Sequence, residues 1–328
     1  RFGKRARGVK AVILAALIAG VGCAGGWVHR EKGVGTRGAV KRIEQSAAAF
    51  DNEPDDSNER LCMQKLGLRQ GCRIHEVESA DTMTLLIGDS HARMAWRAIE
   101  NFNTKQGVST LLIADGGPTN SITGFANRSN ECLTEKDKEW YTAQNELFQF
   151  IEHAQKIHKI FVILRGMYYI APANTVDDAK TSLHAKKCAH ATNQAVFHEK
   201  LQRFVDRMTV AGKEVFIVAE NPELPFQPRN FLPTQPFRPA KTPPLLKKTD
   251  VLQYQQPYLE TLWQIKNATI IPALDVFCPG ETCQITDEQG LSLYLDDDHL
   301  SPVFGGNFLV NKILKPYLEA PPKSSPKQ

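Results

Sequence analysis

The sequence lacks a large excess of charge of one sign, a second long apolar run, an internal repeat and a glycine-rich phosphate loop. Its 40 lysine and arginine residues nearly balance 36 aspartate and glutamate residues. Five of the basic residues lie in residues 1–28, which contain no acidic residue, so the rest of the chain offers no basic face for nucleic acid. With 42% hydrophobic residues and a mean hydropathy of -0.33, the chain is neither disordered, nor collagen-like, nor a polytopic membrane protein within these residues.

The one long apolar run lies near the N-terminus. Residues 11–28 carry no charge over 18 positions, close to the roughly 20 residues that span a bilayer core, and basic residues precede them. Because basic residues stay on the cytoplasmic side, we expect a cytoplasmic segment at 1–10, an inner-membrane helix at 11–28 and a periplasmic remainder. A cleaved signal peptide, or a lipoprotein signal at Cys23, is the alternative, and each would export the same residues. Since the sequence does not begin with Met, we expect it to continue a longer polypeptide.

The cysteines are few, and six of the seven lie beyond the apolar run. An even number of cysteines in an exported domain predicts disulfides. The two pairs closest in sequence would each close a small loop, which leaves the remaining two to pair. The predicted disulfides are Cys62–Cys72, Cys132–Cys188 and Cys278–Cys283. Zinc is the alternative, but the sequence has no Cys-x-x-Cys pair and no histidine pair at ligand spacing, so we expect no metal site.

Short apolar runs and longer amphipathic segments alternate along most of the chain. Residues 29–79 are polar and are expected to form a periplasmic linker, while residues 321–328 are expected to form a disordered tail. The expected strands are Thr82–Ile87, Val108–Ala114, Lys159–Leu164, Glu214–Ala219 and Ala268–Ile271. The expected helices are His91–Phe102, Leu133–Ile157, Ala191–Ala211 and Val303–Leu318.

This alternation predicts the fold class. Strands separated by helices of this length pair in parallel through right-handed crossovers. Residues 80–320 are therefore expected to form an α/β domain, with a flavodoxin-like parallel sheet between two layers of helices. The proline-rich segment Pro222–Pro257 interrupts the pattern and is expected to be a long surface excursion beside the active face.

Three polar segments stand at expected strand ends, where open parallel sheets bind their ligands: residues 88–91, 115–118 and 296–301. Ser90 would lie at a strand-to-helix turn, where backbone N–H groups at the helix start favour a developing anion. A serine hydroxyl needs a base, and His299 is the candidate. Asp296 can orient that imidazole if the segment turns tightly. Ser90, His299 and Asp296 are therefore the predicted catalytic residues.

These residues resemble the SGNH (GDSL-like) hydrolase superfamily, and within it the SGNH domains fused behind a membrane acyltransferase-3 domain. The similar segments are Leu85–Ala92, the Cys278–Cys283 loop and Leu295–Ser301 with Gly305, within a likeness that covers residues 80–318. The resemblance implies the SGNH hydrolase fold and makes residues 11–28 the last helix of an upstream acyltransferase-3 domain. It also implies that this upstream domain takes acyl groups from cytoplasmic acyl-CoA, and that the exported domain needs no cofactor.

The predicted oxyanion hole departs from the superfamily pattern. That pattern usually has an Asn in a Gly-x-Asn-Asp block after the third strand, and residues 164–169 here contain no Asn. The expected donors are the backbone N–H groups of Ser90 and of Gly116 or Gly117. The Arg165 side chain is a third candidate, with a structural ion pair as its alternative role. We expect His91 to support the loop, because His299 already fills the role of base.

The leading functional hypothesis is an O-acyltransferase (O-acetyltransferase) that forms an acyl-serine and passes the group to a hydroxyl of a bacterial surface polysaccharide, such as lipopolysaccharide O-antigen. A carbohydrate esterase (deacetylase) with the same triad is the alternative, and a catalytically silent glycan-binding domain is the second alternative. The intact triad weighs against the silent domain. The aromatic residues of the proline-rich excursion would form an acceptor wall or a plain surface loop: Phe226, Phe231, Phe237 and Tyr254. The expected partners are the upstream acyltransferase-3 domain, the polysaccharide and the membrane.

Overall fold

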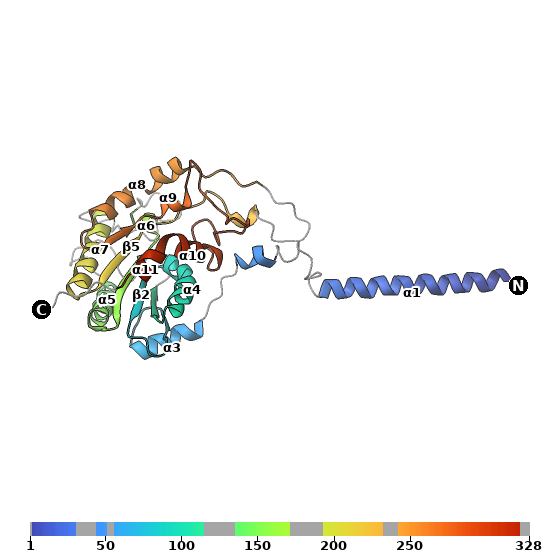
Figure 1. The fold of residues 1–328 in the computed structure, drawn as a ribbon, viewed down its shortest axis with the longest axis horizontal. Helices are drawn as coiled ribbons and strands as arrows, with labels where there is room; N and C mark the ends of the chain where they lie inside the picture. The colour runs from blue at the N-terminus through green and yellow to red at the C-terminus, as the bar shows by residue number, and fades with distance from the viewer. Residues whose placement is uncertain are drawn as a thin grey trace.

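A six-stranded sheet forms the middle layer of the fold (Figure 1). The computed structural model describes residues 2–30, 44–50, 56–114, 135–170, 193–231 and 242–321. The strands are β1 (Cys72–His75), β2 (Met83–Gly88), β3 (Ser109–Ala114), β4 (Ile157–Ile163), β5 (Glu214–Val218) and β6 (Thr269–Ile271). Their order is β1-β3-β2-β4-β5-β6, in which β2 to β6 pair in parallel and β1 is antiparallel to β3. The parallel strands follow the flavodoxin-like order, so the predicted fold class is confirmed.

Helices cover both faces of the sheet and make two apolar cores (Figure 1). The helices on one face are α3 (Asp56–Leu66), α5 (Glu135–His153), α6 (Gly166–Ile170), α7 (Asn193–Val210) and most of α8 (Lys248–Gln264). The helices on the other face are α4 (Ser90–Lys105), α9 (Leu274–Phe277), α10 (Phe304–Leu309), the π-helical turn η3 (Val310–Leu314) and α11 (Lys315–Glu319). Leu85 and Ile87 of β2 enter the first core while Leu86 enters the second, as the period of two in a strand requires.

The structure differs from the predicted linker at residues 56–79. This stretch contains α3 and β1, and β1 extends the sheet at the edge of β3. β1 has only four residues, of which two are half-exposed, so its sequence was too short to show a strand pattern. The Cys62–Cys72 disulfide ties α3 to this edge strand.

The structure also corrects the predicted surface excursion at Pro222–Pro257. Its last ten residues belong to α8, and Pro257 lies inside that helix. A proline removes one helical hydrogen bond. The helix persists because Tyr258, Leu259 and Leu262 are buried in the first core, and tertiary packing supplies most helical stability.

The predicted membrane segment 11–28 lies within α1 (Phe2–Arg30). α1 is long and apolar enough to cross a membrane, although a signal sequence would have the same character. Its apolar side chains from Ile13 to Trp27 are exposed, as a lipid-facing helix requires. Insertion into the inner membrane stays a prediction.

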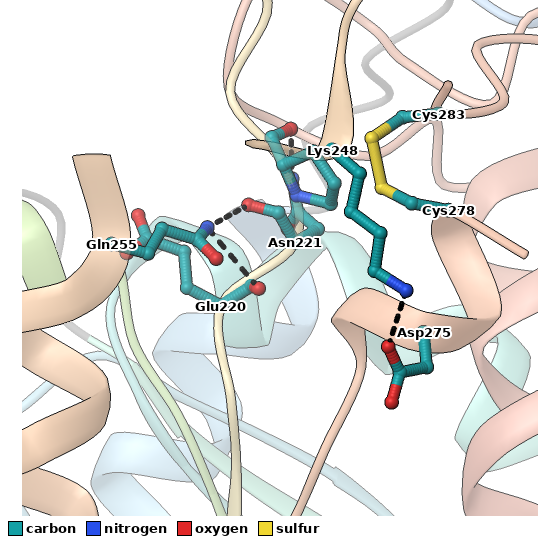
Figure 2. Close-up of a disulfide and its surroundings, with 8 residues drawn as sticks. Glu220, Asn221, Lys248, Gln255, Asp275, Cys278 and Cys283 are labelled. Carbon is teal, nitrogen blue, oxygen red and sulfur yellow. Dashed lines mark hydrogen bonds and ion pairs between the residues drawn. A yellow bond between two sulfur atoms is a disulfide. The ribbon is translucent and has the colours of Figure 1, made fainter. Parts of the chain in front are cut away.

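Two of the three predicted disulfides are present. The Cys278–Cys283 bridge closes a loop after α9, and this loop is joined to the start of α8 (Figure 2). The Cys283 N–H donates to the Leu246 carbonyl at 2.8 Å, and the Lys248 ammonium pairs with Asp275 at 2.7 Å. The third predicted pair, Cys132–Cys188, lies outside the described residues.

The C-terminal helix is fastened to the sheet by a buried lysine. Lys159 on β4 donates to the carbonyl oxygens of Tyr317 at 2.8 Å and Leu318 at 2.9 Å, and also to that of Ala320. Burial lowers the pKa of Lys159, and the nearby charge of Glu214 opposes this shift. The ammonium thus satisfies the carbonyls that end α11, which a helix leaves without internal partners.

Candidate active site

Ser90 is the first residue of α4 and follows directly on the end of β2. Gly88 makes this turn feasible, because a Cβ there would lie 1.9 Å from the Ile163 carbonyl oxygen of the neighbouring strand. Asp89 caps α4 by accepting a hydrogen bond from the His91 N–H at 2.9 Å. The Ser90 hydroxyl therefore lies at a helix N-terminus and at the carboxyl end of a parallel strand.

The Asp89 carboxylate also fixes β2 against β4. Its second oxygen accepts from the Arg165 backbone N–H and from the Tyr169 hydroxyl, each at 2.9 Å. Asp89 is buried. Because β2 and β4 flank the point where the strand order reverses, this carboxylate places Ser90 at the position where such sheets bind ligands.

His299 lies on a tight turn that reaches Ser90 from the other end of the chain. The Leu295 N–H donates to the His299 carbonyl at 2.9 Å and closes the turn. Within it, Asp296 accepts from the His299 N–H at 2.7 Å and faces His299 Nδ1 at 3.0 Å. His299 Nε2 lies 2.7 Å from Ser90 Oγ. The structure thus brings the three predicted catalytic residues into one continuous hydrogen-bond chain.

A second carboxylate, Asp298, reaches the same imidazole. Its Oδ1 lies 3.3 Å from His299 Nδ1. Its Oδ2 lies 3.2 Å from His91 Nε2 and 3.3 Å from Arg165 Nε. His91 therefore holds the turn from α4, in line with its predicted supporting role, while Asp298 was not predicted as a site residue.

The two carboxylates change the acid–base character of His299. Burial lowers the pKa of the His299 imidazole, but hydrogen bonds and charges from Asp296 and Asp298 outweigh burial and raise it to about 10. Burial raises the pKa of Asp298, but hydrogen bonds to His299 and His91 outweigh this and hold it well below its usual range. The imidazolium is therefore favoured at neutral pH, and the neutral ring that can accept the Ser90 proton increases as the pH rises.

The Arg165 side chain forms an ion pair, which was the alternative to its predicted oxyanion role. Its Nε and one terminal nitrogen bind the Glu223 carboxylate at 2.7 and 3.1 Å, and its guanidinium lies 5.6 Å from the centre of the Tyr168 ring. The Tyr254 hydroxyl donates to Glu223 at 3.3 Å. An oxyanion role for Arg165 or the Ser90 N–H stays a prediction. Gly116 and Gly117 lie outside the described residues.

The residues that follow β5 join α8 to the histidine turn, and Figure 2 shows the contact of Gln255 on α8 with Asn221 and Glu220. Gln255 on α8 donates to the Asn221 carbonyl at 3.0 Å, and Asn221 donates in turn to the Asp298 carbonyl at 2.9 Å. Glu220 is fully buried beside them, and burial raises its pKa well above the usual value. The Leu224 N–H donates to the Asp297 carbonyl at 2.6 Å, so the turn is fastened by backbone bonds as well.

Two groups of side chains in the described part of the chain have ligand atoms close enough for a metal ion: His91, Asp298 and His299, and the three consecutive aspartates Asp296 to Asp298. In the first group, each histidine already faces Asp298 at hydrogen-bond or ion-pair distance. A metal would have to replace these interactions with the catalytic base. The expectation of no metal site stays a prediction.

Three of the residues that the sequence analysis missed share one signal. Glu220, Asn221 and Glu223 follow directly on the buried strand β5, at the edge of the sheet where ligands bind. Of the aromatic residues in the proline-rich segment, Phe226 packs edge-to-face on Phe231 with ring centres 4.9 Å apart. Phe237 lies outside the described residues.

Comparisons with known proteins agree with the fold. The model of a family described as "SGNH domain (fused to AT3 domains)" matches residues 54–313. The periplasmic domain of a lipopolysaccharide acetyltransferase from Salmonella ser. Paratyphi A is similar in fold, with a TM-score of 0.51 at 12% identity over 87% of this chain and 98% of that one. At that identity the likeness shows the fold alone. No curated protein matches the chain in sequence.

Two further solved structures are more distant. A putative acylhydrolase from Bacteroides fragilis has a TM-score of 0.40 at 9% identity, over 81% of this chain and 98% of that one. A GDSL-like lipase from Bacteroides thetaiotaomicron has a TM-score of 0.38 at 12% identity, over 80% of this chain and 97% of that one.

Proposed function

Because the chain belongs to the family of SGNH domains fused to AT3 domains, we propose that it is an O-acyltransferase with Ser90 as nucleophile. It passes an acyl group, most simply acetyl, to a hydroxyl of a bacterial surface polysaccharide such as lipopolysaccharide O-antigen. One observation carries the proposal: Ser90 Oγ lies 2.7 Å from His299 Nε2, while His299 Nδ1 faces Asp296 at 3.0 Å. This order of nucleophile, base and orienting carboxylate is the one that acyl transfer requires.

In the first half-reaction, Ser90 Oγ attacks the carbonyl carbon of the acyl donor, and its proton passes to His299 Nε2. The tetrahedral oxyanion is stabilised by N–H groups at the start of α4, with the Ser90 N–H as one donor and Gly116 or Gly117 as the proposed second. The bond to the leaving group then breaks, and that group takes the proton from His299. The product is an acyl-Ser90 ester and a neutral imidazole.

In the second half-reaction, a sugar hydroxyl attacks the acyl-Ser90 carbonyl and gives its proton to His299 Nε2. Collapse of the intermediate releases the acylated sugar and returns the proton to Ser90 Oγ. Water at ~55 M competes for the acyl group, and a positioned acceptor outcompetes it because effective molarities reach ~10⁵ M. The esterase alternative is the same cycle with water as acceptor.

The proposal includes the place of the reaction. α1 would anchor the chain in the inner membrane, with the SGNH domain in the periplasm. An upstream acyltransferase-3 domain would supply the acyl group from cytoplasmic acyl-CoA, as the fusion in this family suggests. The SGNH domain itself would then need no cofactor.

The test uses the whole 328-residue chain, purified in detergent, with 4-nitrophenyl acetate as donor and O-antigen fragments as acceptor. We expect acetylated sugar, an acetylated Ser90 peptide by mass spectrometry, and a loss of about 10⁴-fold in turnover for Ser90→Ala and for His299→Gln. His153→Gln is the matched control, since that imidazole only bonds the Gln149 carbonyl on the exposed side of α5.

Three results would each overturn part of the proposal. Wild-type turnover in Ser90→Ala would show that the nucleophile is misplaced. Acetate release at one rate with and without glycan, and no acetylated sugar, would establish the esterase. Glycan binding without any turnover in the unmodified chain would favour the silent binding domain.

A further inference from the structure

We propose that Asp298 is a second carboxylate partner of His299, a positioning residue that stabilises the charged imidazole together with Asp296 and connects it electrostatically to Arg165. This inference rests on the proposed function, because it assigns His299 the role of base. It adds a fourth group to the predicted Ser90, His299 and Asp296 chain. The inference comes from the arrangement of three side chains around one carboxylate.

The contacts of Asp298 span three separate elements. Oδ1 faces His299 Nδ1 at 3.3 Å on the same turn. Oδ2 faces His91 Nε2 on α4 at 3.2 Å and Arg165 Nε, after β4, at 3.3 Å. The Asp298 side chain is 10% exposed while that of Asp296 is 34% exposed, so water screens Asp298 less. Its charge therefore acts on His299 through a less polar medium.

Groups other than the Asp298 carboxylate also hold the backbone of the turn. Asp296 Oδ1 accepts from the N–H groups of Asp298 at 3.1 Å and of His299 at 2.7 Å. The Asp298 carbonyl accepts from Asn221 Nδ2 at 2.9 Å. The backbone on both sides of Asp298 is thus held by other groups, and its carboxylate faces His299, His91 and Arg165 instead.

Two carboxylates and two nitrogen-bearing side chains are grouped around His299. Asp296 and Asp298 face its Nδ1, and His91 lies beside it with ring centres 4.9 Å apart. Arg165 shares its Nε between Asp298 at 3.3 Å and Glu223 at 2.7 Å. The positive charge of Arg165 therefore partly compensates the Asp298 charge and weakens its effect on the imidazole.

This arrangement makes two opposite predictions for the pH dependence of turnover. The neutral imidazole accepts the Ser90 proton, so kcat/KM rises with pH towards the raised pKa of His299, about 10. Asp298→Asn removes a negative charge next to the ring, so the rising limb moves to lower pH by about one unit or more. Arg165→Gln removes the positive charge beside Asp298 and Glu223. Their negative charges then act more strongly on the ring, so the rising limb moves to higher pH.

The experiment measures kcat/KM for 4-nitrophenyl acetate between about pH 6 and pH 11, with buffer blanks, on the full chain in detergent. Asp297→Asn is the matched control, because it makes the same chemical change at the adjacent residue. Asp296→Asn is compared because loss of the orienting carboxylate lowers the rate at every pH. Circular dichroism and melting temperature establish that each variant is folded.

The expected result is a downward shift for Asp298→Asn, an upward shift for Arg165→Gln and no shift for Asp297→Asn. The inference would be overturned if the rising limb of the pH profile for Asp298→Asn coincided with that for Asp297→Asn, provided that Ser90→Ala is inactive. If Asp298→Asn does not fold, the Arg165→Gln variant tests the inference by itself. A rising limb that moves to lower pH in this variant, or does not move, would then overturn the inference. Activity retained in Ser90→Ala would instead reject the proposed function, so the two failures are distinguishable.

Discussion

Replacing Glu220 with Gln is expected to remove a pH dependence of stability that the buried acid creates. Glu220 is only 3% exposed, and its Oε2 accepts from the Met167 N–H at 3.1 Å. Its Oε1 has no hydrogen-bond partner among the described residues. Burial raises the pKa of this carboxyl well above its usual value, and the charge of Glu223 raises it further. The folded protein therefore keeps Glu220 protonated at a pH where the unfolded chain ionises it.

The sign and size of the effect follow from linkage. A folded pKa above the unfolded value means that the stabilising contribution is complete below pH 4.5, the usual pKa, and is lost as the pH rises towards the raised pKa. The loss is about 1.4 kcal/mol per pH unit in this window. For a domain of this size, each kcal/mol changes the melting temperature by about 2–4 °C, so we expect about 3–6 °C per pH unit. Gln has nearly the same shape and no proton to release, so the variant lacks this slope.

The assay is thermal unfolding of the full chain in detergent between about pH 5 and pH 8, followed by tryptophan fluorescence. Trp96 is buried and reports on the core. The melting temperature of Glu220→Gln minus that of the unmodified chain should increase steadily with pH. Glu281→Gln, at an exposed carboxylate, is the control and should give a flat difference. A flat difference for Glu220→Gln as well would mean that Glu220 is ionised in the folded protein, and would refute this reasoning.

Two further predictions concern stability. Lys159→Met leaves the carbonyls at the end of α11 without their donor, so the free energy of unfolding, measured by urea denaturation, should fall by about 2 kcal/mol. The control Lys105→Met, at an exposed position of α4, should change this free energy little. Replacing both Cys278 and Cys283 with Ser opens a loop with a sequence separation of 5, which should cost about 2 kcal/mol. For the second, a variant without Cys62 and Cys72 and a variant that also lacks Cys278 and Cys283 should melt at the same temperature when both are in reductant, because reduction then opens every remaining disulfide in both.

The central strands could be predicted from the sequence because each is buried on both faces. Val162 faces one core and Phe161 the other, so residues 160–163 of β4 form an uninterrupted apolar run. The edge strand β1 has no such run, since it has one neighbour and two half-exposed residues. The helix α8 could not be predicted from the sequence for a different reason. Proline argues against a helix locally, and only the two cores that α8 contacts outweigh that local preference.

The proposed catalytic residues could be located in the sequence because each lies in a recognisable local segment. Ser90 is defined by the strand end and helix start on either side of it, and His299 by the short acidic turn before it. The contact between them joins residues that are 209 positions apart, which the strand order determines. Arg165 and Glu223 are harder to assign, because either a ligand contact or an ion pair satisfies a charged residue at a strand end.

The role of Asp298 in the acidic turn could not be predicted from the sequence, because all three aspartates there carry the same carboxylate. The difference arises from the backbone, whose turn directs Asp296 onto the N–H groups of Asp298 and His299. The same turn directs the Asp298 carboxylate towards His91 and Arg165, which belong to segments far away in the sequence. One carboxylate therefore shapes the turn and orients the imidazole, and the other brings charge to that imidazole from a buried position. This division explains why an acidic run stands before the base, where a single aspartate would be enough to orient it.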